Sequence, residues 1–392
     1  MPWKETSAVD ERMQLVVAVQ QGASVAQAAR RFGVSRVTAH KWLSRYEAEG
    51  PPGLCDRSRA PHRHPNATGP AVVDRILALR DEWMWGPVKL RNYLLNTEPD
   101  LAVPAASTIG QLLKDHGRSV PRRRRHVAPH TQPLAHCDRP NRVWCADFKG
   151  WFRTADGQRC DPLTISDGYS RYLLCCQIVP RTTRQAVDPL FDAAFREFGM
   201  PWAIRTDNGV PFAATRGLGL SRLAVKWIKC GITPERIRPG NPQENGRHER
   251  MHRTLKQHTL RPPASTWRRQ QRRFDQFRDH YNQVRPHQAL DHQPPERFYE
   301  PSPRPFPSRI PEPEYPSDLD VRRVYTKGSF YWNGHLLHLS EALDNEYIAL
   351  APGPVERYLT IYFGHVPIAF IDTKYARVLH KLPRNATKKD RQ

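Results

Sequence analysis

The stretch that decides the fold is NPQENGRHERMHRTLK, residues 241–256. Its opening residues are rich in Asn, Pro and Gly, which favours a turn, and the residues that follow predict a helix. Glu249 stands on this helix among basic side chains, with Arg250, Arg253 and Lys256 after it. Positions i, i+4 and i+7 share one face of a helix, so we expect Arg253 and Lys256 on the Glu249 side, where they would hold DNA.

Two further acidic residues lie upstream, each at the end of an apolar run that predicts a strand. Asp147 lies in VWCADFKGW (143–151), and Asp207 follows WAIRT (202–206). An enzyme that cuts or joins phosphodiesters with divalent cations needs carboxylate ligands for the metals and positive charge for the DNA. Each aspartate also has an ordinary alternative: pairing with Lys149 for the first, and an Asp-Asn-Gly turn for the second.

Together these segments resemble the three acidic motifs of the retroviral-integrase-type DDE transposases of bacterial insertion sequences. The resemblance extends to YNQVRPHQALDHQPPERFY (281–299), which is similar to the block that closes the catalytic core in that group. It implies that Asp147, Asp207 and Glu249 are catalytic and hold two Mg²⁺ ions, with Mn²⁺ able to substitute. It also implies a ribonuclease-H-like core in which the two aspartate strands lie side by side and the Glu249 helix packs across their ends.

The resemblance further implies a reaction and its partners. Water first nicks the DNA at the ends of the element and frees 3′-OH groups, which then attack target DNA by the same in-line geometry. The partners are double-stranded DNA, as transposon ends and as target, and a homo-oligomer of at least two copies, because two ends are joined at once. The alternatives are a catalytically inactive, transposase-derived DNA-binding regulator and, less favoured, a ribonuclease-H-type nuclease.

Spacing alone leaves the third acidic ligand open. Forty-one residues lie between Asp207 and Glu249, whereas thirty-six lie between Asp207 and Glu244, nearer the spacing usual in the family. Glu244 lies in the turn, however, where its carboxylate would cap backbone N–H groups. Glu249 follows an Asn-Gly pair by three residues and precedes a basic residue, as the ligand does in the family. We therefore expect Glu249 to be the ligand and the surplus residues to be an insertion around 216–223.

The composition indicates a polyanionic partner. The chain has 392 residues and a formal net charge of +22, and nucleic acid is the simplest partner for that charge. The sequence shows neither an apolar run long enough to span a bilayer nor a secretory leader, so we expect no membrane partner and a cytoplasmic bacterial protein, associated with the nucleoid when bound. Its seven cysteines lack a Cys-x-x-Cys pair and indicate neither a disulfide framework nor a zinc knuckle.

Two helix-turn-helix units are expected ahead of the core. In residues 1–50, Ser24 can cap one helix, Gly33 makes the turn, and a second helix (35–46) has a basic exposed side. Its expected DNA contacts are Arg36, Thr38, His40 and Lys41. Residues 70–118 predict three more helices that resemble the second helix-turn-helix, or winged-helix-like, unit of these transposases. An ordinary helical hairpin and a purely structural helical domain are the respective alternatives.

The order of elements predicts a multidomain α/β protein with N-terminal helix-turn-helix domains, a central ribonuclease-H-like (integrase core) α/β domain and a C-terminal small β-barrel. The expected boundaries are 1–50 and 70–118 for the helix-turn-helix domains, 51–69 for a linker, 119–140 for a basic linker, 141–300 for the core, 301–316 for a Pro-rich linker, 317–376 for the barrel and 377–392 for a basic tail. In the basic linker, Arg123 and Arg124 are expected to follow DNA phosphates. Within the core, Pro189 predicts either a kink in a helix over 182–198 or a late start with Asp188 as its cap.

Overall fold

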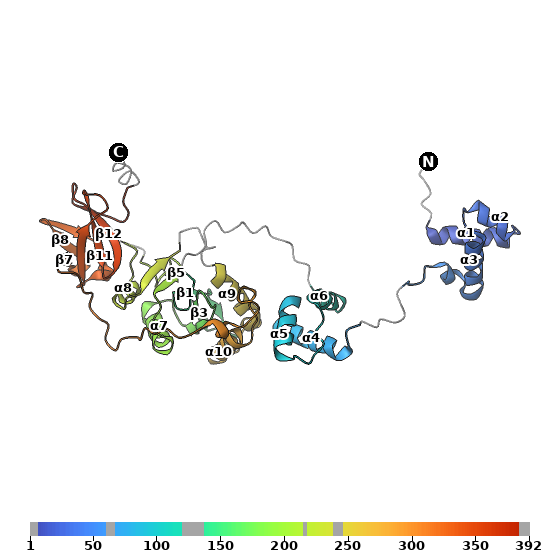
Figure 1. Ribbon diagram of the computed structural model, residues 1–392, viewed down its shortest axis with the longest axis horizontal. Helices are drawn as coiled ribbons and strands as arrows, with labels where there is room; N and C mark the ends of the chain where they lie inside the picture. Colours follow the sequence, from blue (N-terminus) through green and yellow to red (C-terminus); the bar gives the residue numbers. More distant parts are fainter. Residues whose placement is uncertain (1–6, 60–66, 120–136, 215–217, 238–245, 384–392) are drawn as a thin grey trace. The chain divides into compact units, whose positions relative to one another are not determined.

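The computed structural model of the protein describes residues 7–59, 67–119, 137–214, 218–237 and 246–383 (Figure 1). Arg123, Arg124 and Glu244 lie outside these residues, as does part of the expected insertion around 216–223. The chain divides into two compact units, Met1–Thr68 and Gly69–Gln392. In the described part of the chain, every helix is too short or too polar to cross a bilayer.

The first unit is a small helical bundle. It consists of α1 (Ala8–Gln20), α2 (Val25–Arg31), α3 (Arg36–Glu49) and the short helix η1 (Pro51–Leu54). The Ser24 hydroxyl accepts a hydrogen bond from the backbone N–H of Gln27, and the Ser35 hydroxyl accepts one from that of Thr38, which fixes where α2 and α3 begin. Gly33 has a φ of 64° and makes the turn between them. The helix, turn and helix predicted for this segment are therefore present.

Three more helices begin the second unit and form what we call the helical module. They are α4 (Pro70–Trp83), α5 (Pro87–Thr97) and α6 (Ala106–Asp115). Proline opens α4 and α5, at a position where the missing N–H has no intrahelical partner. The three helices bury Ile76, Leu90 and Ile109 in one apolar cluster, which Val284 also contacts from the far end of the core.

A mixed sheet forms the centre of the core. Its strands are β1 (Val143–Phe148), β2 (Phe152–Arg153), β3 (Arg159–Asp167), β4 (Leu173–Val179), β5 (Ala203–Thr206) and β6 (Thr233–Arg236). The spatial order is β4-β3-β1-β5-β6, with the short β2 paired to the start of β3. β3 is antiparallel to β1 and β4, whereas β1, β5 and β6 are parallel. The pairing of β1 with β5 places the two aspartate strands side by side, as the resemblance implied.

Helices cover both faces of this sheet. They are α7 (Arg184–Phe198), α8 (Arg222–Lys229), α9 (Gly246–Thr259) and α10 (Trp267–Gln283). Successive residues of a strand point to opposite faces, and in β4 Leu174 packs with α7 and α8 whereas Leu173 packs with α9 and α10. By the same alternation Trp144 of β1 faces α7, so Asp147 faces α9.

Pro189 neither starts nor ends a helix. α7 begins at Arg184 and continues through Pro189, so the predicted late start with Asp188 as cap is wrong. The buried stripe that includes Val187 and Phe191 holds the first turns of α7 on the sheet, although proline removes one backbone donor. The carboxylate of Asp188 instead accepts a hydrogen bond from the Lys226 amino group of α8, at 2.7 Å.

The C-terminal strands do not confirm the small β-barrel. β7 (Asp320–Arg323), β10 (Tyr347–Pro352), β11 (Tyr358–Phe363), β12 (Val366–Asp372) and β13 (Arg377–Leu379) form a five-stranded sheet, and β8 (Ser329–Trp332) and β9 (His335–His338) form a separate hairpin. Among the described residues no ladder closes these strands into a barrel. They share one apolar cluster, which Val225 and Ile228 of α8 join. This C-terminal β domain is therefore packed on the core.

The Pro-rich segment before the β domain is also tied to the core. The guanidinium of Arg304 donates to the carbonyls of Pro201, Cys230 and Gly231, and its backbone carbonyl accepts from the N–H of Met200. These contacts lay the segment along the loops that enter β5 and β6, so it runs over the core surface as an ordered strap.

Candidate catalytic site

The parallel pairing of β1 with β5 brings two of the predicted acidic residues to one edge of the sheet. Val143 pairs with Ala203 and Cys145 with Arg205. Continued by two residues, the same offset sets Asp147 level with Asp207. Both strands run in the same direction, so both side chains lie at their carboxyl ends. The backbone N–H of Gly209 donates to Asp207 Oδ1 at 3.0 Å and orients that carboxylate.

Helix α9 adds the third acid to the same neighbourhood. Glu249 lies in the first turn of α9 and is exposed. Burial, the negative charge of Asp207 and the negative charge of Glu249 raise the pKa of Asp147 to about 7, against the N–H of Phe148 and the positive charge of Lys149. The three acids that the sequence singled out therefore interact electrostatically.

Two histidines that sequence reasoning missed fix α9 beneath this site. His248 and His252 are buried, and the Thr164 hydroxyl lies 2.7 Å from the Nε2 atom of each. Thr164 pairs with Asp147 across β1 and β3, and its hydroxyl also contacts the Asp147 carbonyl at 3.1 Å. The Ser166 hydroxyl lies 3.0 Å from His248 Nδ1. These contacts join α9 to β3 and, through the Thr164 hydroxyl, to Asp147 of the neighbouring strand β1.

The hydrogen-bond chemistry assigns the protons of the two imidazoles. Thr164 has one hydroxyl proton, which it donates to the Asp147 carbonyl, so its oxygen accepts from both Nε2–H groups. His252 Nδ1 is then unprotonated and lies 3.7 Å from Asp147 Oδ2. Burial lowers the pKa of His248 to about 3 and, with the influence of His248 and Lys149, that of His252 to about 2. Both rings are therefore neutral near pH 7, and neither offsets the charge of Asp147.

Basic side chains lie beside the acids. Burial and the positive charge of Lys256 lower the pKa of Lys149, and Asp147 opposes this shift. Lys256 is therefore close enough to Lys149 to interact with it, and Lys149 in turn interacts with Asp147. Arg253 is exposed on the same helix, and Arg250 is exposed but interacts with Lys89 of the helical module.

The DNA contacts expected in the first unit lie on α3. The side chains of Arg36, His40 and Lys41 are exposed, and that of Thr38 is half-buried. The Thr38 hydroxyl lies 2.9 Å from the Ser35 hydroxyl, so part of its hydrogen-bonding capacity serves the helix cap. The remaining three side chains are accessible to a partner.

The donor set fits a divalent cation by its chemistry. Asp147, Asp207 and Glu249 offer the oxygen ligands that Mg²⁺ prefers, and a cation between them would relieve the repulsion that raises the pKa of Asp147. Within the part of the chain that the structure describes, no three His, Cys, Asp or Glu side chains lie close enough together to hold a metal ion. Binding would therefore require the carboxylates to draw together.

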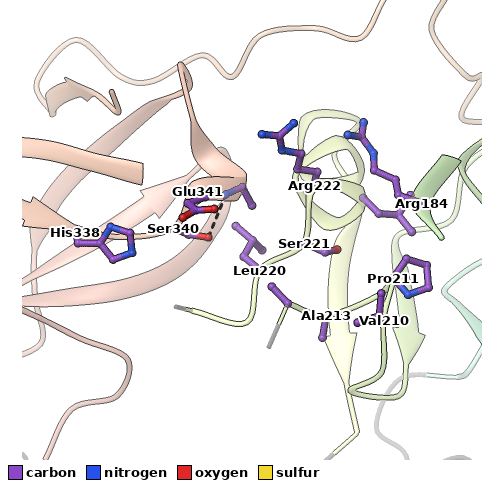
Figure 2. A pocket seen from close by; sticks show the side chains of 13 residues that line it. Arg184, Val210, Pro211, Ala213, Leu220, Ser221, Arg222, His338, Ser340 and Glu341 are labelled. Carbon is purple, nitrogen blue, oxygen red and sulfur yellow. Dashed lines mark hydrogen bonds between the residues drawn. The ribbon is translucent and has the colours of Figure 1, made fainter. Parts of the chain in front are cut away.

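A cavity of about 640 Å³ lies beyond the Asp207 edge, between the core and the β domain. Figure 2 shows Arg184 and Arg222 on its core side and His338, Ser340 and Glu341 on its β-domain side. Val210 and Pro211 of the loop that follows Asp207 also line it. The cavity thus borders the loop that follows Asp207 and carries two arginines on its core side.

Comparison with known proteins locates similar domains. Residues 138–242 and 230–295 match integrase core domain families, and residues 6–55 and 38–113 match homeodomain-like domain families. These matches cover the predicted α/β core and the predicted helix-turn-helix region, and they confirm both.

Proteins of bacterial insertion elements resemble the chain over part of its length. An uncharacterised protein of an insertion element of Xanthomonas euvesicatoria is 28% identical over 286 residues, or 71% of this chain and 79% of that protein. A second, from an insertion element of Burkholderia multivorans, is 29% identical over 194 residues, or 48% of this chain and 67% of that protein. A solved structure of the HTLV-2 integrase catalytic core domain with magnesium is 16% identical, with a TM-score of 0.34, over 42% of this chain and 99% of that chain. The predicted resemblance to insertion-sequence proteins is confirmed.

Proposed function

We propose that this chain, which carries an integrase core and resembles proteins of bacterial insertion elements, is a DDE transposase. It would bind the ends of its element, nick the DNA to free 3′-OH ends and transfer these ends to target DNA. One observation carries the proposal: the β1–β5 register sets Asp147 level with Asp207, and α9 brings Glu249 close enough to shift the pKa of Asp147. Three acids at one edge of an integrase core support phosphodiester chemistry.

In this proposal Asp147, Asp207 and Glu249 hold two Mg²⁺ ions. The ions would activate the attacking oxygen and stabilise the leaving oxygen. The protein's own part is to position the ligands: paired strands place the aspartates, and the N–H of Gly209 orients one of them. The hub formed by Thr164, His248 and His252 holds α9, and with it Glu249, against β3.

Positive charge beside the acids would hold the DNA. Lys149 and Lys256 lie next to the Asp147 edge, and Arg253 is exposed one turn beyond Glu249. In the first step water attacks a phosphodiester at the element's end, and the 3′ oxygen leaves. In the second step that 3′-OH attacks a target phosphodiester, so one bond forms as another breaks and no external energy source is needed.

Recognition of the element's ends is assigned to the helix-turn-helix region. Arg36, His40 and Lys41 are the accessible members of the predicted set on α3. The double variant Arg36→Ala, Lys41→Ala should weaken binding to the ends more than binding to random DNA, by about 1–3 kcal/mol, if a base edge is read. Gel-shift titrations at fixed salt measure both affinities, and an equal loss on both DNAs would show that these residues contact phosphates alone.

The test of catalysis uses DNA that carries the inverted repeats flanking the gene. Wild type should nick this DNA in Mg²⁺ or Mn²⁺, whereas Asp147→Asn, Asp207→Asn and Glu249→Gln should bind it normally and leave it intact. Glu244→Gln should lower stability slightly and keep activity. A dead Glu244→Gln with an active Glu249→Gln would reverse the assignment of the third ligand.

The same assay separates the alternative functions. A DNA-binding regulator would bind the repeats without any cation-dependent nicking by the wild-type chain. A ribonuclease-H-type nuclease would cut an RNA–DNA hybrid in preference to the repeats. Either result would overturn the proposal.

A further inference from the structure

Basic side chains from three elements meet where the helical module contacts the core. Lys89 lies on α5, Arg250 on α9, and Arg285 just beyond α10. His258, His280 and His287 lie among them, since each interacts with Arg285 or with its neighbours. We call this set the cationic junction.

Packing contacts define the junction's geometry. The ring of Trp83, at the end of α4, stacks on His280 with centroids 3.4 Å apart and planes at 5°. Val284 packs into the apolar cluster of the helical module, which contains Leu90, the neighbour of Lys89. On the other side, Arg285 Nη2 lies 3.5 Å from the hydroxyl of Thr254, one turn beyond Arg250 on α9. The junction thus joins α5, α9 and α10.

The cations of the junction lack acidic partners. Among the described residues, Lys89, Arg250 and Arg285 take part in no ion pair. Burial, Arg285 and Arg250 lower the pKa of Lys89 to about 7, and burial lowers the pKa of Arg285. Lys89 and Arg285 are half-buried, and half-buried cations that repel one another disfavour the folded state unless an anion joins them.

Unused hydrogen-bond capacity lies at the same place. The Nε2 atoms of His280 and His287 are buried without a hydrogen-bond partner among the described residues, as is the indole N–H of Trp85. A lysine ammonium and a guanidinium fork are the groups that bind phosphate oxygens best. An anion with several acceptor oxygens would therefore suit this set of donors.

We propose that the cationic junction binds a phosphate of the DNA backbone and so holds the helical module and the core on the same DNA end. The inference rests on the proposed function. Its position favours DNA over a free anion, because Arg250 follows Glu249 directly on α9. A strand that reaches the candidate catalytic acids from the helical module passes this junction.

The test compares variants that remove one charge each. Lys89→Met keeps the apolar stem and removes the cation, Lys89→Arg keeps the charge, and Arg285→Gln removes the guanidinium. Arg272→Gln is the matched control, because Arg272 is exposed on α10 away from the junction. All are made in a Glu249→Gln background without divalent cations, so that binding is measured apart from catalysis.

Two results are expected. Without DNA, Lys89→Met should leave the melting temperature unchanged or raise it, since a repelled cation is removed. With DNA, it should reduce the slope of log affinity against log salt concentration by about one, as loss of one phosphate contact does, while Lys89→Arg and the control keep the wild-type slope. An unchanged slope in Lys89→Met and Arg285→Gln would overturn the proposal.

Neutral phosphate analogues then locate the contact. Duplexes with a single methylphosphonate, scanned along the element's end, should reveal one position that weakens wild-type binding about tenfold and leaves Lys89→Met unaffected. Inorganic phosphate supplies the other arm: if it raises the melting temperature in a Lys89-dependent way while no methylphosphonate position depends on Lys89, the junction is a free-anion site. Absence of cation-dependent nicking by the wild-type chain would refute the proposed function and leave the junction result standing.

Discussion

Asp147 is held where its negative charge is disfavoured. Its folded-state pKa of about 7 lies above the ordinary 3.8 because of burial and two neighbouring acids. Between these values Asp147 binds more protons in the folded state than in the unfolded state. Without divalent cations its contribution to stability should therefore fall as the pH rises from about 4 to about 7. Asp147→Asn should lose this decline and melt several degrees higher than wild type at pH 8.

Urea unfolding at pH 5 and pH 8 in a chelator measures the effect. Mg²⁺ at pH 8 should restore stability to wild type and leave Asp147→Asn unchanged, because a cation bound only to the folded state stabilises it. Equal changes in stability for wild type and Asp147→Asn between the two pH values would contradict the electrostatic account of the site.

The sequence alone predicted the acidic residues of the candidate site, but it did not predict the buried side chains that hold them in place. Asp147 and Asp207 end apolar runs, which predicts their place at strand ends without any knowledge of packing. His248 and His252 acquire a role only when α9 is placed on β3. The sequence did contain one signal for this role, because both histidines lie on the same helical face as the apolar residues Met251 and Leu255. Read as buried, that face would have marked them.

At the scale of elements, the docking of α9 depends on one hydroxyl. Thr164→Val keeps the side-chain shape but leaves the Nε2–H groups of two buried imidazoles without an acceptor, which costs about 1–3 kcal/mol for each group. We expect a clear loss in the free energy of unfolding and a drop in Mg²⁺-dependent nicking, with end binding by the first unit retained.

Thr259→Val is the matched control on α9. Its hydroxyl is buried but donates only to the Leu255 carbonyl of the same helix, so its loss should change the free energy of unfolding by less than about 1 kcal/mol. Equal effects of the two substitutions on unfolding and on nicking would show that the Thr164 hub does not position α9.

Several elements differ from their prediction because a local sequence pattern does not determine tertiary packing. Alternating residues and turn signals predicted the C-terminal strands, but closure into a barrel depends on register between distant strands, which no local pattern encodes. Pro189 gave the wrong helix start because tertiary packing of Val187 and Phe191 outweighs one lost backbone hydrogen bond. Ala213 forms an isolated bridge with Leu220 and α8 begins at Arg222, whereas residues 215–217 lie outside the described part of the chain, so the insertion expected around 216–223 stays a prediction.

At the scale of the second unit, α8 joins the core to the C-terminal β domain. Val225 and Ile228 enter the β-domain cluster. The Lys229 amino group contacts Glu346 of the β domain at 3.1 Å and Glu312 of the strap at 3.0 Å. The sequence predicted a Pro-rich boundary here, and proline content alone did not reveal that the boundary is bound to the core along its length. The cavity of Figure 2 therefore lies at a joint that these contacts hold together.

Contact between the helical module and α10 should weaken in acid. His280 stacks on Trp83, lies near Trp85 and His258, and feels the positive charge of Arg285. Burial, Arg285 and His258 lower its pKa from 6.5 to about 3, so between these values the unfolded chain binds more protons than the folded chain. The contribution of His280 to stability is therefore fully present above about pH 6.5 and is lost as the pH drops towards 3.

His280→Phe should keep the stacked ring and remove the proton site. Between pH 7.5 and pH 5 the variant should lose less unfolding free energy than wild type, by about 1 kcal/mol, because part of the site is solvated. His258 and His287, whose pKa values burial also lowers, to about 4 and about 3, remain in the variant and keep a residual acid dependence. Urea titrations at the two pH values give the comparison. Parallel losses in both proteins would show that groups other than His280 cause the acid dependence. The stack of His280 on Trp83 would then not be what acid disrupts.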